Sequence, residues 1–254
     1  MTVIAISVFA LACADLARAG DRSRSGPAAL GVAVAASALG VVLLGVFTIE
    51  EVVLVAVGLA AVIAWVVTSG RPMRTRVDYG LPLGVLAVGL LVLVVAMGWV
   101  PVREAGGLLG QWVERVPLAA GAVPPATVLL VAASMLAQLS TANIVVRLVL
   151  ASVGALKPAG QPQASDRLRG GRLLGPMERL LILGLGLAGQ PTAAGLVIAA
   201  KGLIRFPELQ AQARRGRGAA EEPGIDELTE YFLIGSFVSW LFALASLAFI
   251  VVFG

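Results

Sequence analysis

Residues 171–206 read GRLLGPMERLLILGLGLAGQPTAAGLVIAAKGLIRF, two apolar segments separated by Gly189, Gln190 and Pro191. Glycine often ends a helix, and proline is favoured in the first turn of the next one. The stretch therefore predicts a helical hairpin with its tip at residues 189–191. Each arm has about 16 residues, or roughly 24 Å of helix, against a hydrocarbon core of about 30 Å. Such short arms favour a re-entrant hairpin over one that crosses the bilayer.

The rest of the chain consists of similar apolar segments. Of its 254 residues, 59% are hydrophobic and 13% are charged, and the mean hydropathy is +0.95. This composition is too apolar for a soluble domain and indicates an integral membrane protein. The segments lie at about residues 2–17, 28–47, 51–69, 80–98, 125–153, 173–188, 191–206 and 229–253. We therefore expect an all-α, polytopic fold with about eight membrane helices, including the hairpin.

The segments form two groups along the chain. Residues 1–124 hold four membrane helices and the amphipathic stretch PVREAGGLLGQWVERVP at residues 101–117. This stretch predicts a helix at the outer membrane surface, anchored by Trp112, because tryptophan prefers the headgroup region. Residues 125–254 hold the remaining helices and the hairpin motif. We take the two groups as the N-terminal and C-terminal domains.

The basic residues of the connections indicate the orientation. Fourteen of them follow the first, third and fifth segments or precede the last, whereas the alternate connections hold Arg103 and Arg115. Cytoplasmic loops carry the excess of Lys and Arg, so both termini are expected outside. A single span over 171–206 would put the basic stretches 157–172 and 205–217 on opposite sides, whereas a hairpin keeps both in the cytoplasm. Arginine makes up 17 of the 19 basic residues, which is typical of a high-G+C bacterium and suggests a bacterial plasma membrane.

Several classes of chemistry are excluded by what the chain lacks. It has no histidine and one cysteine, Cys13, so it holds no Ser-His-Asp triad, Cys-His pair, zinc helix or intramolecular disulfide. There is no GxxxxGK[ST] phosphate loop, and Asp15 and Arg18 form only a fragment of the acidic motif of membrane CDP-alcohol phosphotransferases. No metal and no cofactor are predicted. Because the basic residues lie in short loops between apolar segments, the expected partners are membrane lipids and not nucleic acid.

Charged residues inside the hairpin mark a candidate site. Glu178 and Lys201 lie equally far along the chain from the tip, so a symmetric hairpin places them opposite each other and predicts an ion pair. Arg179 and Arg205 then remain as cations beside the pair. Arginine presents a planar fork of donors that suits a phosphate or carboxylate group. The alternative is ordinary anchoring of these arginines at the cytoplasmic surface.

Polar residues elsewhere in the C-terminal half complete the candidate site. Asn143 and Arg147 share one helical face of segment 125–153. Glu230 and Tyr231 lie at the entry to the last segment, where Glu230 could pair with one of the cations. At the tip, the first backbone N–H groups of the second arm could receive an anion beside Gln190. The alternative is that Gln190 simply caps that arm.

Three segments, GRLLGPMERLLIL, LAGQPTAAGLVIAAKGLIRFPEL and TEYFLIGSFVSW, resemble the C-terminal part of a family of uncharacterised prokaryotic multi-pass membrane proteins. The family's signature reads GRxxGxxER, then GQ, AAK, RF and EYxLIG, and the resemblance covers about residues 140–245. It implies that the signature positions are Gly171, Arg172, Gly175, Glu178, Arg179, Gln190, Lys201, Arg205, Phe206, Glu230, Tyr231 and Gly235. It implies no activity, because the family is defined by a domain of unknown function.

Three hypotheses about function follow. The first is that the protein binds or translocates an anionic amphiphile, such as a phospholipid or polyprenyl phosphate, on the cytoplasmic side of the membrane. The candidate ligand-binding residues are Asn143, Arg147, Arg179, Gln190, Lys201, Arg205, Glu230 and Tyr231. The second is a membrane-embedded enzyme that acts on a phosphorylated lipid, with Glu178 as general acid or base. The third is an accessory or scaffolding subunit whose polar groups pair with each other or with a membrane protein partner.

Overall fold

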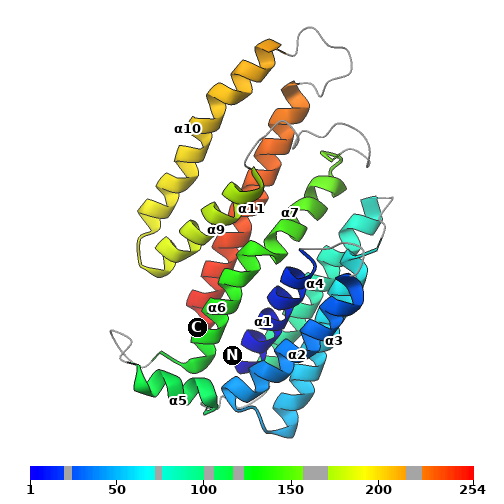
Figure 1. The fold of residues 1–254 in the computed structure, drawn as a ribbon, viewed down its shortest axis with the longest axis vertical. Helices are drawn as coiled ribbons and strands as arrows, with labels where there is room; N and C mark the ends of the chain where they lie inside the picture. The colour runs from blue at the N-terminus through cyan, green and yellow to red at the C-terminus, as the bar shows by residue number, and fades with distance from the viewer. Residues whose placement is uncertain (20–24, 72–75, 100–105, 117–122, 157–170, 216–224) are drawn as a thin grey trace. The chain divides into compact units, whose positions relative to one another are not determined.

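The computed structural model describes residues 1–254 except 20–24, 72–75, 100–105, 117–122, 157–170 and 216–224 (Figure 1). Every regular element in the described residues is an α-helix, as expected for an all-α fold. The helices are α1 (Thr2–Ala17), α2 (Ser25–Leu44), α3 (Ile49–Ser69), α4 (Arg76–Met97), α5 (Leu108–Arg115), α6 (Pro125–Leu139), α7 (Thr141–Ser152), α9 (Gly171–Leu187), α10 (Pro191–Arg215) and α11 (Ile225–Phe253). Their start signals are local: Thr48 caps α3, for example, by accepting a hydrogen bond from the Glu51 N–H.

Four of the described helices are long and apolar enough to cross a membrane. They contain the candidate spans Gly26–Leu44, Ile49–Ser69, Asp78–Met97 and Thr229–Phe253. The bent pair α6 and α7 supplies a fifth if it counts as one broken span. The chain is thus an all-α, membrane-embedded protein, but the described residues support four or five spans and not about eight. The difference arises because α1, α9 and the apolar part of α10 (Pro191–Leu203) are shorter than the ~20 residues that a full crossing needs.

The chain divides into two compact units. Unit 1 comprises Met1–Met73, Leu81–Thr141 and Ala248–Gly254, and unit 2 comprises Arg74–Gly80 and Ala142–Leu247. These units follow packing in space, whereas the predicted domains, 1–124 and 125–254, follow the order of segments along the sequence and stay a prediction.

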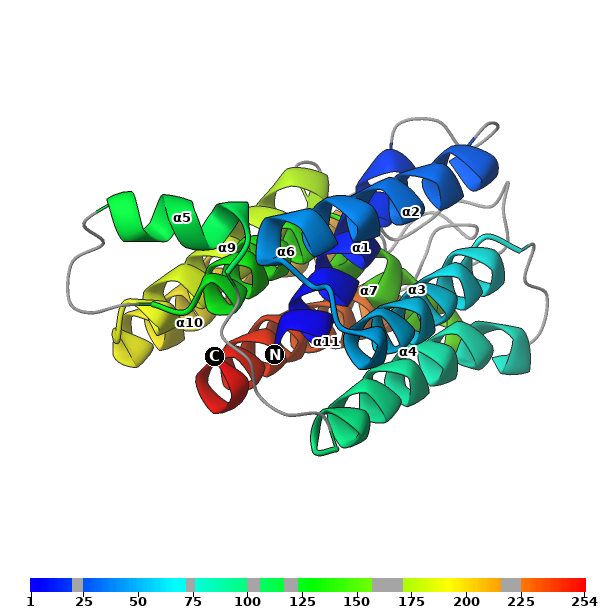
Figure 2. The ribbon, with the colours of Figure 1, turned by 90° about the horizontal axis from the view of Figure 1, so that it is seen from below.

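Helix α1 occupies the interior of unit 1. It packs against α2, α3 and α6 (Figure 2), and Ile4, Ala5 and Ile6 are completely buried. A helix that is apolar on all sides is buried against other helices. Its small residues Ala10 and Ala12, which are also completely buried, leave room for those neighbours. The first apolar segment is therefore a central packing element of its unit.

The predicted fifth segment, residues 125–153, is broken at Ser140. Helix α6 ends there and α7 begins at Thr141, with a bend of 46° between them. The Ser140 hydroxyl donates to the Ala12 carbonyl at 3.0 Å and lies 3.1 Å from the Leu136 carbonyl, so the break is fixed to α1. A side-chain hydroxyl that hydrogen-bonds backbone carbonyls in this way is a recognised cause of helix bending.

Helix α5 packs against the end of α2 through two glycines. Gly45 adopts a φ of 67°, and a Cβ at Gly45 or at Gly107 would overlap the backbone of the other residue. On the outside of α5, Leu108 and Trp112 are 55% and 49% exposed, one turn apart. Exposed apolar residues on one face are typical of an interfacial helix, and the position of α5 at the membrane surface stays a prediction.

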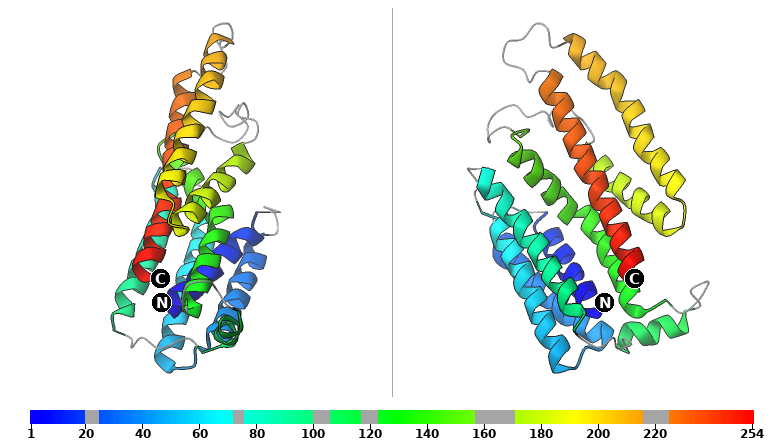
Figure 3. Two further views of the ribbon diagram at one scale, coloured as in Figure 1. Left: turned by 90° about the vertical axis from the view of Figure 1, so that its left-hand side faces the viewer. Right: turned by 180° about the vertical axis from the view of Figure 1, so that it is seen from behind.

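In unit 2, α9 and α10 form the predicted hairpin, which Figure 3 shows joined at a common tip. Gly189 has a φ of 73°, a conformation that other residues adopt at a cost. The Gln190 N–H donates to the Leu185 carbonyl at 2.8 Å, which closes α9 in a Schellman-type turn. Proline then opens α10 at Pro191. The hairpin with its tip at 189–191 is confirmed.

The hairpin packs against α11 through a small apolar core. Ile182, Ala194 and Ala243 are at most 5% exposed, and Leu185, Val197, Ile198 and Trp240 pack around them. Gly186 of α9 lies so close to α11 that a Cβ at this position would overlap the side chain of Leu247. This packing brings the charged residues of α9 and α10 to the same face of α11.

Candidate functional site

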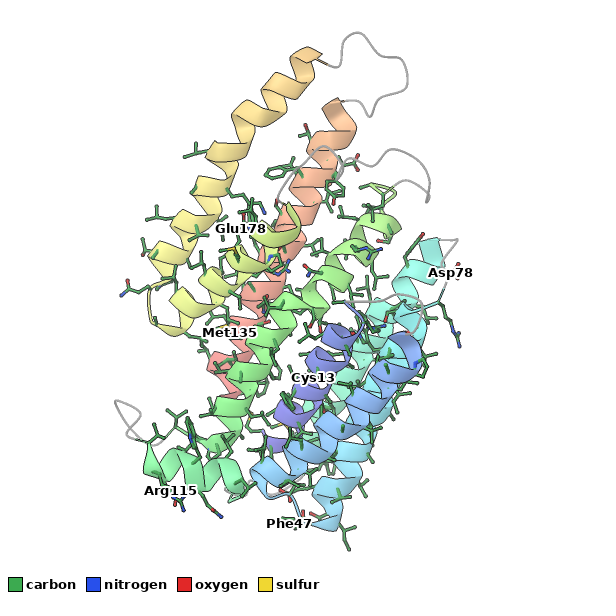
Figure 4. The ribbon with its side chains drawn as sticks, in the orientation of Figure 1. Cys13, Phe47, Asp78, Arg115, Met135 and Glu178 are labelled. Carbon is green, nitrogen blue, oxygen red and sulfur yellow. The ribbon has the colours of Figure 1, made fainter. Side chains whose placement is uncertain are left out.

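Glu178 and Lys201 form an ion pair across the hairpin. The Lys201 Nζ lies 2.6 Å from the Glu178 Oε2, and each side chain is 16% exposed. Figure 4 shows Glu178 on the part of α9 that lies beside α10. The predicted ion pair is confirmed, because the tip lies at the expected residues and the two arms run with equal register away from it.

The Lys201 ammonium also lies between two aromatic rings of α11. Its Nζ is 5.8 Å from the centroid of Phe232 and 5.9 Å from the centroid of Trp240. At these distances the negative ring faces attract an ammonium ion. Lys201 is therefore held by a carboxylate from α9 and by two rings from α11. The sequence pattern predicted the carboxylate but neither of the rings.

Arg179 follows Glu178 on α9 but faces other helices. It is 2% exposed. Its guanidinium donates to the Ser239 Oγ of α11 at 3.0 Å and to the Asn143 Oδ1 of α7 at 2.5 Å. Arg179 thus joins three helices of unit 2 and is buried among them. We call Asn143, Glu178, Arg179, Lys201 and Ser239 the hairpin cluster.

The other candidate residues lie in different surroundings. Gln190 is exposed at the tip, roughly 18 Å along the helix direction from Glu178. Glu230 is exposed on the first part of α11, where Tyr231 is half-buried. Arg147 is exposed on α7, one turn beyond Asn143. The side chain of Arg205 lies outside the described residues, so its predicted place in the cluster stays a prediction.

The hairpin cluster contains two basic side chains and one acidic one, Arg179, Lys201 and Glu178. Asn143 and Ser239 accept hydrogen bonds from Arg179 and so orient its guanidinium. Guanidinium and ammonium groups are the side-chain groups that bind phosphate and carboxylate in proteins. The composition of the cluster therefore suits an anionic group.

A second buried polar centre lies in unit 1. The Asp15 side chain of α1 is fully buried and pairs with Arg18, and the Trp65 Nε1 lies 3.1 Å from both of its carboxylate oxygens. Arg18 also donates to the Ser69 Oγ at 2.9 Å and to the Val66 carbonyl at 3.1 Å. The signal in the sequence was an acid and a base three residues apart at the end of an apolar segment. Their partner Trp65, 50 residues from Asp15, carried no signal.

No protein-family model, no curated protein and no solved structure matches the chain. Among the described residues, no three His, Cys, Asp or Glu side chains lie together in a way that could hold a metal ion. The chemistry of the hairpin cluster therefore has to be inferred from its own geometry.

Proposed function

We propose that the protein binds or translocates an anionic amphiphile within the membrane and receives the anionic head group at the hairpin cluster. The observation that carries this proposal is the position of Arg179, a permanent cation that is 2% exposed and is oriented by the neutral groups of Asn143 and Ser239. Its neighbour Glu178 is engaged by Lys201 at 2.6 Å. An arginine and a lysine held close together suit one phosphate or carboxylate group.

The strength of such binding depends on the surroundings of the charges. Two opposite charges attract several-fold more strongly in an apolar helix pack than in water. A guanidinium already held by two hydrogen bonds is also preorganised, so little side-chain freedom is lost when an anion binds. Both effects favour Arg179 as the residue that contributes most to head-group affinity.

The apolar surface around the cluster favours a ligand with a hydrocarbon tail. Met177 and Leu181, which flank the charged pair on α9, are 50% and 51% exposed. Leu203, two residues beyond Lys201 on α10, is 76% exposed. An amphiphile matches this surface, because its hydrocarbon tail can lie against the exposed apolar side chains while its anionic head group binds the buried cation. A phospholipid or a polyprenyl phosphate fits this description.

The membrane arrangement forms part of the same proposal. We place the chain in a bacterial plasma membrane with both termini outside, about eight membrane helices including the hairpin, and the hairpin cluster towards the cytoplasmic side. Membership of the family with the GRxxGxxER signature belongs to the proposal as well. Arg18 and Arg71, at adjoining ends of α1 and α3, support the orientation, because basic residues favour cytoplasmic ends.

A scaffolding function is the second candidate. It is favoured by the contacts among the residues of the cluster: Glu178 and Lys201 form an ion pair, and Arg179 donates hydrogen bonds to two other helices. A purely structural cluster would hold α7, α9, α10 and α11 together and bind no lipid. The same pairing makes an enzyme with Glu178 as general base a weaker candidate, because the carboxylate is already engaged by an ammonium group.

Native mass spectrometry of the purified full chain tests the proposal. The wild-type protein is expected to retain an anionic lipid through detergent exchange, and Arg179→Gln is expected to lose it. Arg115→Gln, at an exposed arginine of α5, is the matched control and should retain the lipid. Equal lipid retention by the wild type and Arg179→Gln would leave the scaffold as the better explanation.

A further inference from the structure

Trp240 carries a buried hydrogen-bond donor beside the hairpin cluster. Its indole Nε1 is fully buried and has no hydrogen-bond partner within the described part of the chain. The ring centroid is 5.9 Å from the Lys201 Nζ, and the preceding residue, Ser239, accepts a hydrogen bond from Arg179. Trp240 therefore presents an unused donor close to Lys201, one residue along α11 from the Ser239 that binds Arg179.

Apolar packing alone does not explain an indole at this position. Trp240 packs around the core of Ile182, Ala194 and Ala243, where a phenylalanine ring would fill space without a polar atom. A buried indole N–H usually has an acceptor, and leaving it without one costs free energy. The chain itself supplies the comparison, since the Trp65 Nε1 in unit 1 lies 3.1 Å from both oxygens of Asp15. The indole of Trp240 lacks this kind of acceptor.

The Lys201 ammonium group near Trp240 has more donors than its contact with Glu178 uses. An ammonium group has three protons, and one of those of Lys201 is directed to Glu178 at 2.6 Å. The remaining protons of Lys201 and the N–H of Trp240 have the same requirement, which is an oxygen with available lone pairs. A phosphate meets it, because each of its charged oxygens can accept more than one hydrogen bond.

Resting on the proposed function, we propose that Trp240 is a head-group residue: its Nε1–H donates to a phosphate oxygen of the ligand, and the Lys201 ammonium holds the same phosphate. The Lys201 Nζ lies 5.9 Å from the centroid of the Trp240 ring. A phosphate carries several oxygens, so the two donors need not share one oxygen to bind the same group. The ligand class is thus a phosphorylated amphiphile, recognised jointly from α10 and α11.

Trp240→Phe is the informative variant, because it keeps an aromatic ring for packing and for Lys201 but removes the donor. Trp112→Phe, on the exposed face of α5, is the matched control. The full chain in neutral detergent is titrated with dodecyl phosphate, and binding is followed by calorimetry and tryptophan fluorescence. Trp240→Phe should weaken binding about 10- to 100-fold, the worth of one hydrogen bond to a charged group, and Trp112→Phe should not change it. Thermal unfolding without ligand should be no lower for Trp240→Phe than for the wild type.

Two further comparisons distinguish a failure of the role of Trp240 from a failure of the proposed function. If dodecyl phosphate binds the wild type, and Arg179→Gln abolishes binding but Trp240→Phe does not weaken it, the role of Trp240 is refuted and the proposed function stands. If dodecyl phosphate does not bind the wild type at all, the proposed function fails and the inference fails with it. Inorganic phosphate is expected to bind far more weakly than dodecyl phosphate; equal affinity would show that the site takes free phosphate and would overturn the assignment to a lipid.

Discussion

The Glu178 carboxylate and the Lys201 ammonium lie 2.6 Å apart, although 23 residues separate them along the chain. This pair fixes the register of the hairpin arms, and it engages Glu178, the only acidic residue of α9. Its removal therefore affects both the hairpin and the charge of the hairpin cluster.

Glu178→Gln is expected to destabilise the protein by about 1–3 kcal/mol, between the values for exposed and buried ion pairs, because both side chains are partly buried. The double reversal Glu178→Lys with Lys201→Glu should recover part of the loss. Thermal unfolding in detergent measures both effects. Glu114→Gln, at an exposed residue of α5, is the control. If the reversal is no more stable than the sum of the single changes, the two residues do not interact as described.

Arg179→Lys keeps the charge but cannot reach Ser239 and Asn143 with one planar group. We expect a loss of about 2–3 kcal/mol in stability, since two hydrogen bonds from a buried charged group are disturbed, together with weaker head-group binding. Arg115→Lys should change neither quantity. The measurements are thermal unfolding and the dodecyl phosphate titration, and unchanged values for Arg179→Lys would contradict the two-helix attachment of the guanidinium.

Gly189→Ala should destabilise the hairpin by about 1 kcal/mol, because alanine is strained at positive φ. Nothing lies within 4 Å of a Cβ built on Gly195, which is in the first turns of α10. Gly195→Ala should therefore be neutral or stabilising by up to about 1 kcal/mol. Opposite signs for the two substitutions in thermal unfolding are the expected result. A matching sign would argue against the left-handed turn at the tip.

Asp15→Asn should destabilise unit 1 by about 3–5 kcal/mol, because it leaves the partly buried Arg18 without its counter-ion. Trp65→Phe removes the donor on the other side of the carboxylate. The double variant should lose less than the sum of the single losses, by about 1 kcal/mol, since both act on one carboxylate. A double-mutant cycle on thermal unfolding gives this coupling energy, and additive losses would show that the Asp15 and Trp65 contact is energetically unimportant.

The hairpin and its ion pair could be predicted from the sequence because their signals are local. Glycine and proline mark the tip, and the equal distances of Glu178 and Lys201 from it follow from counting residues. The surroundings of Arg179 could not be predicted in the same way. Its acceptors Asn143 and Ser239 come from helices 36 and 60 residues away, so their approach depends on tertiary packing.

The number of spans was overestimated for a related reason. Hydropathy identifies apolar segments, but it does not give the length of the helix that each segment forms. Helix α1 has 16 residues, fewer than the ~20 of a full crossing, and its completely buried Ile4 and Ile6 pack inside unit 1. Segment 125–153 read as one helix because the effect of Ser140 on the backbone depends on Ala12, which is distant in sequence.

Adjacent residues on α9 make separate attachments: Glu178 holds α10, and Arg179 holds α7 and α11. Loss of the ion pair would weaken the first attachment and leave the second in place. The arms of the hairpin would then separate at the ion pair while α9 stays attached to α7 and α11. The ion pair therefore sets the mobility of α10 relative to the other helices of unit 2.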